Sequence, residues 1–250
     1  MLPFILLSLL ILNIGTCTIV RLAWGGKFTY DKKASPLYNG KNILIGGLMS
    51  QPDDDFAGIS ELPYQMSLML RYSVLGFNPK NAGRQIRELT KRKDVLIANS
   101  IGCKALAYSR TNFNERAFIN PLSHSIILDS EYQLILEFLG PILEVITYLL
   151  GWIAVIPFIK TGKNSRYSLA LIADQLYFLQ YGDPSYEDLE DLEQSYLLLS
   201  IGNEHVQRDI AISIYENVKK YRSVPIRSVH ISNPDAASVY GRAIKELLVH

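Results

Sequence analysis

The chain of 250 residues carries 25 Lys and Arg against 24 Asp and Glu, a formal net charge of +1, and 48% of its residues are hydrophobic. This composition excludes an intrinsically disordered protein, and the balanced charge gives no overall electrostatic reason to expect nucleic acid as a partner. Two cysteines without a Cys-x-x-Cys or His-x-x-x-His spacing exclude a disulfide scaffold and a zinc site of the usual structural kind.

The first twenty residues contain no charged side chain, and Arg21 is the first. A run of this length fits a membrane anchor or the apolar part of a signal peptide, so we expect residues 1–21 to serve as one or the other. Cleavage after Gly15 or Thr16 would export the protein. Without cleavage, the basic flank would keep the body on the cytoplasmic side of the membrane; the flank comprises Arg21, Lys27, Lys32 and Lys33. A buried element of the fold is a third alternative.

Past residue 40, short apolar runs alternate with segments of helical spacing. The pattern predicts strands at 42–47, 94–98, 117–119, 196–201 and 226–231, and helices at 63–75, 81–92, 206–220 and 238–249. Buried apolar strands that alternate with amphipathic helices indicate an α/β fold with a mostly parallel central sheet flanked by helices, here over residues 22–250. In such sheets the working site lies beyond the carboxyl ends of the strands.

A serine stands at the turn between the predicted strand 94–98 and the helical start that follows it. The turn reads Ala98-Asn-Ser-Ile-Gly102, with Ser100 at its apex and small residues at both ends. The helix would aim its first N–H groups at the point where an oxyanion develops. The turn resembles the nucleophile elbow of the α/β-hydrolase superfamily, usually Gly-x-Ser-x-Gly, with Ala98 in place of the first glycine. The alternative is a serine that only caps a helix.

The resemblance implies an oxyanion hole and an acid that orients the catalytic base. Two backbone N–H groups would hold the oxyanion, one from Ile101 and one from Leu48, which follows a pair of glycines at the end of the strand 42–47. The family takes its acid from the loop after the penultimate strand. Glu204 is the best candidate there, and Asp209 is the second. Both residues could equally be surface charges at the start of a helix.

The resemblance also implies a catalytic histidine in the loop after the last strand. Residues 232–238, which follow the predicted last strand, contain no histidine. His230 inside that strand and His205 beside the acid remain as candidates, and His124 lies at the entrance to the segment that precedes the fourth strand. We therefore assign the catalytic roles to Ser100, Glu204 and His230, with loss of the base as the alternative.

The segment between the third and fourth predicted strands contains an unusually apolar stretch. Residues 134–159 are interrupted only by Glu137 and Glu144. The resemblance implies a helical cap here, over about residues 123–192, lining a pocket for an acyl chain. Cap helices that pack on their own core and a surface that rests on a membrane are alternatives. The acidic stretch 183–193 is expected to be a solvated helix start, with Ser185 and Asp188 as a capping box.

Three functional hypotheses follow. The first is a serine hydrolase that acts on ester or acyl substrates of apolar character and needs no cofactor or metal. The second is a catalytically impaired binding or scaffold protein of the same fold, associated with a membrane through residues 1–20. The third is a membrane-associated protein whose cap and N-terminus both rest on lipid. The localisation expected from all three is membrane-associated or exported.

Overall fold

The computed structural model describes residues 2–33, 41–48, 66–161, 165–189, 192–201, 206–224, 239, 241–243 and 246. Seven strands form the main sheet in the order β1-β3-β2-β4-β5-β8-β9. Their bounds are Phe28–Lys33 (β1), Lys41–Ile45 (β2), Met66–Tyr72 (β3), Val95–Asn99 (β4), Glu115–Ile119 (β5), Ser195–Ser200 (β8) and Lys220–Val224 (β9). Only β1 is antiparallel to its neighbour, so the mostly parallel α/β sheet expected from the sequence is confirmed.

The central strands are apolar runs because helices and loops cover both faces of the sheet. Every residue of β4 and of β8 is buried. Successive side chains of β2 join opposite hydrophobic clusters, Ile43 and Ile45 on one face and Leu44 on the other. Helices α4 (Pro79–Leu89) and α5 (Gly102–Ser109) pack on the first face. These strands match the predicted runs 42–47, 94–98, 117–119 and 196–201.

The helix predicted at 63–75 is wrong, because Met66–Tyr72 forms strand β3 between β1 and β2. Leu68 and Leu70 pack into one cluster and Met69 into the other. A strand buried on both faces loses the alternation that identifies strands, and its spacing then imitates a helix. Strand β1 was not predicted from the sequence.

The C-terminal elements also differ from the prediction. The helix predicted at 206–220 is the shorter α9, Arg208–Ile214, and Lys220–Val224 forms the edge strand β9 beside β8. The strand predicted at 226–231 lies outside the described residues. The described residues of the predicted C-terminal helix, among 239–246, are helical.

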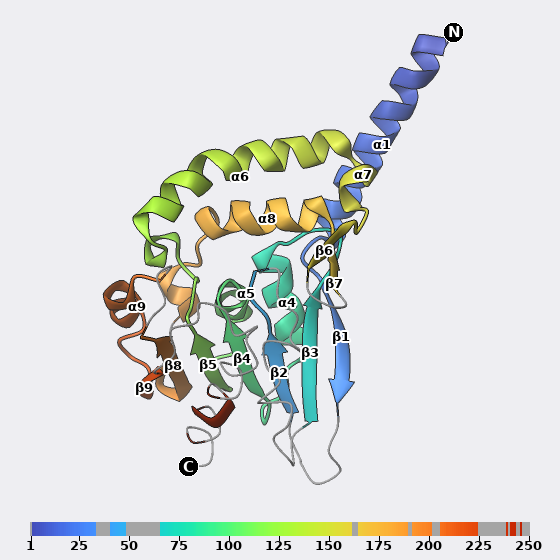
Figure 1. The fold of residues 1–250 in the computed structure, drawn as a ribbon. Helices are drawn as coiled ribbons and strands as arrows, with labels where there is room; N and C mark the ends of the chain where they lie inside the picture. The colour runs from blue at the N-terminus through green and yellow to red at the C-terminus, as the bar shows by residue number, and fades with distance from the viewer. Residues whose placement is uncertain are drawn as a thin grey trace.

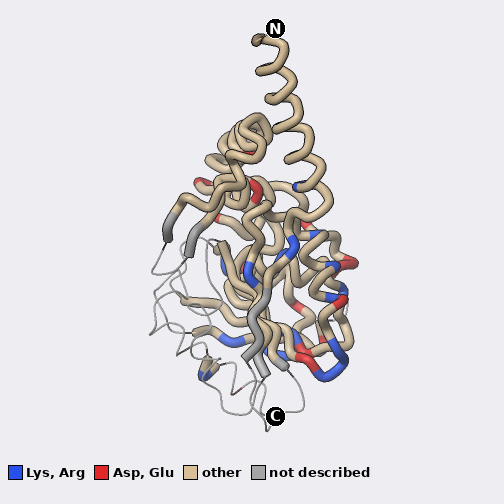
Figure 2. Tube along the Cα trace, turned by 90° about the vertical axis from the view of Figure 1, so that its right-hand side faces the viewer, with Lys and Arg blue, Asp and Glu red and all other residues tan. Residues whose placement is uncertain are grey.

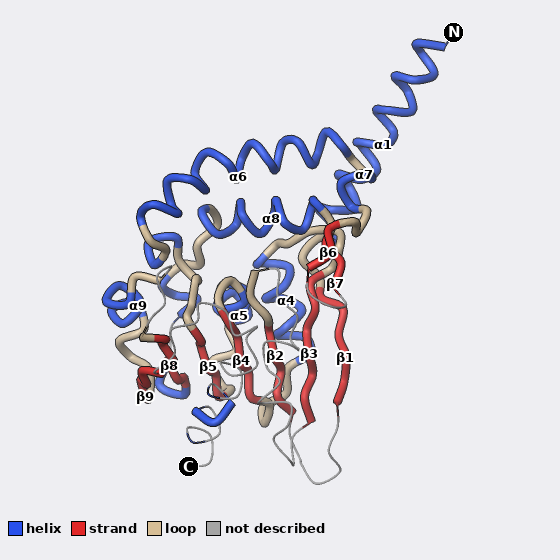
Figure 3. Tube along the Cα trace, in the orientation of Figure 1, coloured by secondary structure: helices blue, strands red, loops and turns tan. Residues whose placement is uncertain are grey.

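A mostly helical insertion covers the carboxyl ends of the parallel strands (Figures 1 and 3). It lies between β5 and β8 and contains η1 (Ser125–Ile127), α6 (Ser130–Leu150), α7 (Trp152–Val155), β6 (Ile159–Thr161), β7 (Ser165–Tyr167), α8 (Leu169–Gln180), η2 (Tyr186–Leu189) and η3 (Leu192–Gln194). Helices α6 and α8 run side by side above the sheet. The β6–β7 ribbon is an addition to the helical cap predicted over about residues 123–192.

Helix α1 (Leu2–Trp24) leaves the body of the protein at the end of the cap (Figure 1). Residues 2–12 are exposed, whereas the second half of the helix contacts α6 and α7. Asn13 donates to the carbonyl of Leu150 at 3.2 Å, and Cys17 is buried against the cap. Arg21, which the sequence analysis placed in the basic flank, is 3% exposed and pairs with Asp174 of α8.

Candidate functional site

Ser100 occupies a strained turn between β4 and α5. Its φ is 52°, in the left-handed region, which costs a residue other than glycine roughly 1–2 kcal/mol. Three hydrogen bonds hold this backbone. The N–H of Ser100 donates to the carbonyl of Ile119 at 3.0 Å, and its carbonyl accepts from Cys103 at 3.1 Å and Leu122 at 3.1 Å. Strain that the surroundings maintain in this way is typical of functional sites.

Small residues are needed on both sides of the turn because backbones approach closely there. A Cβ on Gly102 would lie 2.6 Å from the carbonyl oxygen of Gly46, and a Cβ on Gly47 would lie 2.9 Å from the Cβ of Ser100. The glycine pair at the end of β2 therefore lies directly against the serine. This contact confirms that the two motifs singled out in the sequence meet in space.

Two backbone N–H groups flank the serine. Ile101 is the N-cap of α5, and Leu48 is the half-buried residue after Gly47. Among the residues that the structure describes, neither N–H has a hydrogen-bond acceptor, and the hydroxyl of Ser100 has no partner. The start of α5 adds the positive end of a helix dipole. Such an arrangement can stabilise negative charge on an oxygen held beside Ser100.

The other predicted catalytic residues, Glu204 and His230, lie outside the described residues, as does His205. Glu204 comes four residues after the end of β8 at Ser200, and Asp209 is exposed in the first turn of α9. Strand β9 ends at Val224, six residues before His230. The strand predicted at 226–231 also lies outside the described residues, so the placement of His230 within it stays a prediction.

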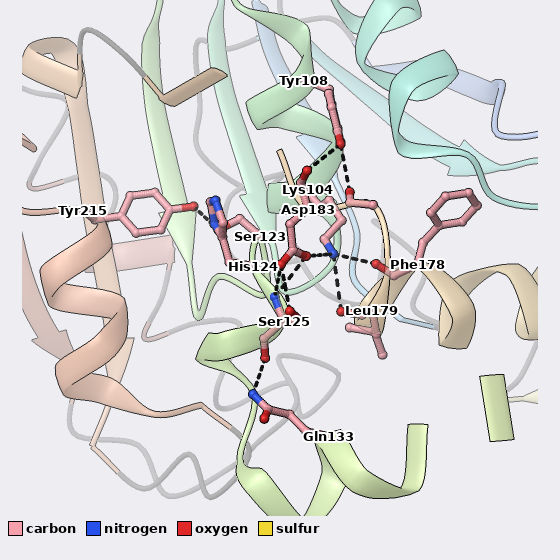
Figure 4. Close-up of polar contacts among 11 residues, drawn as sticks. Lys104, Tyr108, Ser123, His124, Ser125, Gln133, Phe178, Leu179, Asp183 and Tyr215 are labelled. Atoms are coloured by element: carbon pink, nitrogen blue, oxygen red, sulfur yellow. Dashed lines mark hydrogen bonds and ion pairs between the residues drawn. The ribbon is translucent and has the colours of Figure 1, made fainter. Parts of the chain in front are cut away.

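A buried lysine that the sequence reasoning did not single out lies on α5, one turn from the serine. The Lys104 ammonium donates to the carbonyls of Phe178 at 2.6 Å and Leu179 at 3.3 Å and pairs with Asp183 at 2.8 Å (Figure 4). Burial lowers the pKa of Lys104. The lysine thus binds the last carbonyls of α8, where a positive charge also complements the helix dipole.

Asp183 completes this cluster by holding the chain where it enters the cap. It accepts hydrogen bonds from the N–H of Ser125 at 3.0 Å and from the Ser125 hydroxyl at 2.7 Å (Figure 4). Burial opposes its ionisation, but Lys104 and Ser125 together hold its pKa below the usual range. One lysine and one aspartate therefore tie both ends of the cap to helix α5, which begins two residues after Ser100. A single lysine within the apolar helix 102–109 was the signal available in the sequence.

The acidic stretch 183–193 is therefore less solvated than expected. The capping-box contact is present, since the N–H and hydroxyl of Ser185 both donate to Asp188 at 2.9 Å. Asp188 itself is 4% exposed and pairs with Arg110. The aspartates in this part of the cap exit consequently anchor it to α5 and to the turn that follows α5.

His124 lies in the loop that leads into the cap, as the sequence indicated. Its Nδ1 is 3.1 Å from the Ser123 hydroxyl, which accepts a hydrogen bond from Tyr215 at 2.9 Å. Its Nε2 is buried without a partner among the described residues, and burial lowers its pKa. Across all the residues that the structure describes, no three His, Cys, Asp or Glu side chains come together as a metal site requires.

Comparison with solved structures identifies the architecture. A monoacylglycerol lipase from Paleococcus ferrophilus superimposes with a TM-score of 0.58 at 16% identity, covering 89% of this chain and 98% of that one. A hydrolase from Oleispira antarctica gives 0.61 at 9% identity over 90% and 95% of the two chains. A thermophilic esterase from Thermogutta terrifontis gives 0.61 at 11% identity over 89% and 93%.

The chain has the α/β-hydrolase fold. In this chain the Ser100 turn follows β4, and the mostly helical insertion follows β5. No family model matches the sequence, and no curated protein is similar to it.

Proposed function

We propose that the chain is a serine hydrolase that cleaves carboxylic esters, with Ser100 as the nucleophile. The observation that carries this proposal is the left-handed backbone of Ser100. This residue lies between β4 and α5, and three hydrogen bonds hold its backbone. A helix cap alone does not require this conformation, because N-cap residues normally adopt extended backbone angles. The structural neighbours include a lipase and an esterase, which favours ester substrates.

The proposed base is His230 and the proposed orienting acid is Glu204. Support comes from the order of the elements, since Glu204 follows β8 and His230 follows β9, the last strand of the described sheet. A serine hydroxyl needs a base because it is a poor nucleophile at neutral pH. His205, adjacent to Glu204 in the sequence, is the competing candidate for the base.

The proposed reaction has two steps. The Ser100 oxygen attacks the ester carbonyl and its proton passes to the imidazole of His230, while the N–H groups of Ile101 and Leu48 hold the oxyanion. Collapse of this intermediate breaks the ester bond, and the leaving alkoxide takes the proton from the imidazolium. Water, deprotonated by the same imidazole, then attacks the acyl-serine. Collapse of this second intermediate releases the acid, and the imidazolium returns its proton to the Ser100 oxygen.

The alternative of a non-catalytic scaffold rested on the absence of a histidine after the last strand. The end of β9 at Val224 weakens that argument, because His230 comes six residues after the last strand that the structure describes. We therefore favour the hydrolase over the scaffold.

Labelling of the full chain with a fluorophosphonate probe, followed by mapping of the modified residue, tests the nucleophile. We expect label on Ser100 and none on the Ser100→Ala variant. Turnover of a short acyl ester should fall on the order of 10⁴ to 10⁶ fold in that variant. Ester turnover that survives Ser100→Ala, or a label that maps to another serine of the folded protein, would refute the assignment.

The base is identified by comparing His230→Ala with His205→Ala. We expect a loss close to that of Ser100→Ala for the first variant and a change of a few fold for the second, with circular dichroism as the folding control. The reverse ranking would assign the base to His205.

We further infer that the N-terminal segment stays attached and acts as a membrane anchor. The support is its integration with the cap. Asn13 accepts from the N–H of Trp152 at 3.2 Å, and the Trp152 indole donates to Thr16 at 2.9 Å. Cleavage after Gly15 or Thr16 would remove the Asn13 contacts. Helices α1 and α6 are the two described helices long and apolar enough to cross a membrane, by length and composition only.

Mass spectrometry of the protein purified from membranes of the expressing cell tests retention. We expect an N-terminal peptide that includes Asn13, and carbonate-resistant association with the membrane fraction. A mature N-terminus at residue 16 or 17 would identify a signal peptide instead.

A further inference from the structure

The outer face of cap helix α6 has a burial pattern opposite to that of a helix in a water-soluble protein. The buried residues of α6 are Leu136, Gly140 and Thr147, so only one large apolar side chain of this helix is buried. Large apolar side chains face outward instead, each at least 56% exposed; six of them are Leu134, Ile135, Phe138, Ile142, Val145 and Leu149. With 3.6 residues per turn they lie within an arc of about 100°, so they form one continuous stripe.

This stripe, named here the α6 face by its six residues, carries almost no charge. Between residues 132 and 158 the acidic side chains are Glu137 and Glu144, and no basic side chain occurs. Glu144 is turned away from solvent, 3.7 Å from the buried Arg21. Figure 2 shows the same segregation, with charged residues gathered over the lower part of the molecule and few on the cap and α1. Exposed apolar patches of this kind mark interaction sites.

The free half of α1 indicates what covers the α6 face. Residues 2–12 are exposed on all sides and are apolar apart from Ser8. A helix that is apolar all round is enclosed either by the core of a large protein or by lipid. Residues 2–12 lie outside the body of the described structure, so lipid is the occupant that fits. In both views the free half projects from the same end of the molecule on which α6 lies (Figures 1 and 2).

Polar contacts between α1 and the cap join the two apolar surfaces. The indole of Trp152, the first residue of α7, donates a hydrogen bond to Thr16 of α1. Arg21 forms an ion pair with Asp174 of the cap. A bilayer that accepts the free half of α1 therefore comes up against α6 as well. Trp152, which is 39% exposed, lies where α1 leaves the cap, and tryptophan is enriched at the interface between membrane and water.

We propose that the α6 face is a lipid-docking surface, which lies in the interface of the same bilayer leaflet that holds the free half of α1. The anchor then does more than tether the protein, because it fixes the cap against the membrane. The proposal does not depend on the catalytic assignment of Ser100.

A fluorescent reporter of environment tests this in the full chain, reconstituted at one copy per phosphatidylcholine nanodisc. The probe nitrobenzoxadiazole is attached to Ile142→Cys on the α6 face or, as the matched control, to Glu88→Cys on the exposed side of α4. The two native cysteines are buried, and the unsubstituted protein treated in parallel gives the background. A second position on the face, Leu149→Cys, covers the case in which Ile142→Cys does not fold, as judged by circular dichroism.

We expect the emission of the α6 probes to shift to shorter wavelength and to be quenched by lipids that carry a doxyl group near the top of the acyl chain. The probe on Glu88→Cys should keep the emission seen in water and remain unquenched. Emission as in water at both α6 positions would overturn the proposal. A shift without lipid quenching would overturn it as well, and would assign the face to a protein partner or to a second copy of the chain.

Discussion

The contacts of Lys104 predict that this side chain holds the cap in place. Lys104 is fully buried and makes three polar contacts, to two carbonyls at the end of α8 and to Asp183. The substitution Lys104→Met keeps most of the apolar stem and removes the charge and all three contacts. Asp183 and the two carbonyls then lose the partner that compensates for their removal from water.

The expected cost follows from how much water can replace the lysine. Deleting one partner of a fully buried ion pair costs about 3–5 kcal/mol. The Asp183 side chain is 32% exposed and keeps its hydrogen bonds to Ser125, so water and Ser125 offset part of the loss. We expect the free energy of unfolding to fall by roughly 2–3 kcal/mol. At about 2–4 °C per kcal/mol for a chain of this size, Tm falls by about 5–10 °C.

Thermal and urea unfolding measure this loss. Both are followed by circular dichroism, with wild type and variants in one detergent. Lys93→Met is the matched control, because Lys93 is exposed in the turn before β4 and the change there should stay within about 0.5 kcal/mol. A Lys104→Met variant as stable as Lys93→Met would refute the reasoning that the lysine joins cap and sheet.

Three further predictions concern the elbow and the cluster. Gly47→Ala should lower kcat/KM by about 10² fold, because the new Cβ would displace Ser100, whereas Gly15→Ala, with open space around its Cβ, should leave ester turnover unchanged. In urea titrations, the free energy of unfolding should be about 0.5–1 kcal/mol higher for Ser100→Gly than for Ser100→Ala, because glycine relieves the strain of the left-handed backbone. Equal stability of the two variants would contradict the strain. The lowered pKa of Asp183 contributes stability that is present above its usual value of 3.8 and is lost as the pH falls through the lowered value. The unfolding free energy of Asp183→Asn should therefore fall less than that of the wild type between about pH 5 and pH 3, and parallel curves would contradict the shift.

Local chemistry was sufficient to predict the centre of the sheet and the elbow. Strands β2, β4, β5 and β8 are short, mostly apolar runs ended by turn residues, and the Ser100 turn lies directly between the end of β4 at Asn99 and the start of α5 at Gly102. Each of these features depends on side chains that are adjacent in the sequence. The α/β class and the position of the serine could therefore be predicted without knowledge of the tertiary structure.

The edges of the sheet could not be predicted in this way. Strand β9 reads Lys-Tyr-Arg-Ser-Val and is largely exposed or half-buried, so its sequence carries no apolar run. It becomes a strand because β8 beside it supplies hydrogen-bond partners. Strand β3 has the opposite problem, since burial on both faces removed its alternation.

Charges whose partners are distant in the sequence were decided only by the tertiary structure. Lys104 meets Asp183 across 79 residues, and Arg21 meets Asp174 across 153. A buried charge is stable only when a partner offsets its desolvation, and no local pattern reveals a partner so far along the chain. The sequence alone determined that residues 1–20 are apolar and uncharged. Only packing decided that the second half of this helix belongs to the cap while the first half and the α6 face remain exposed.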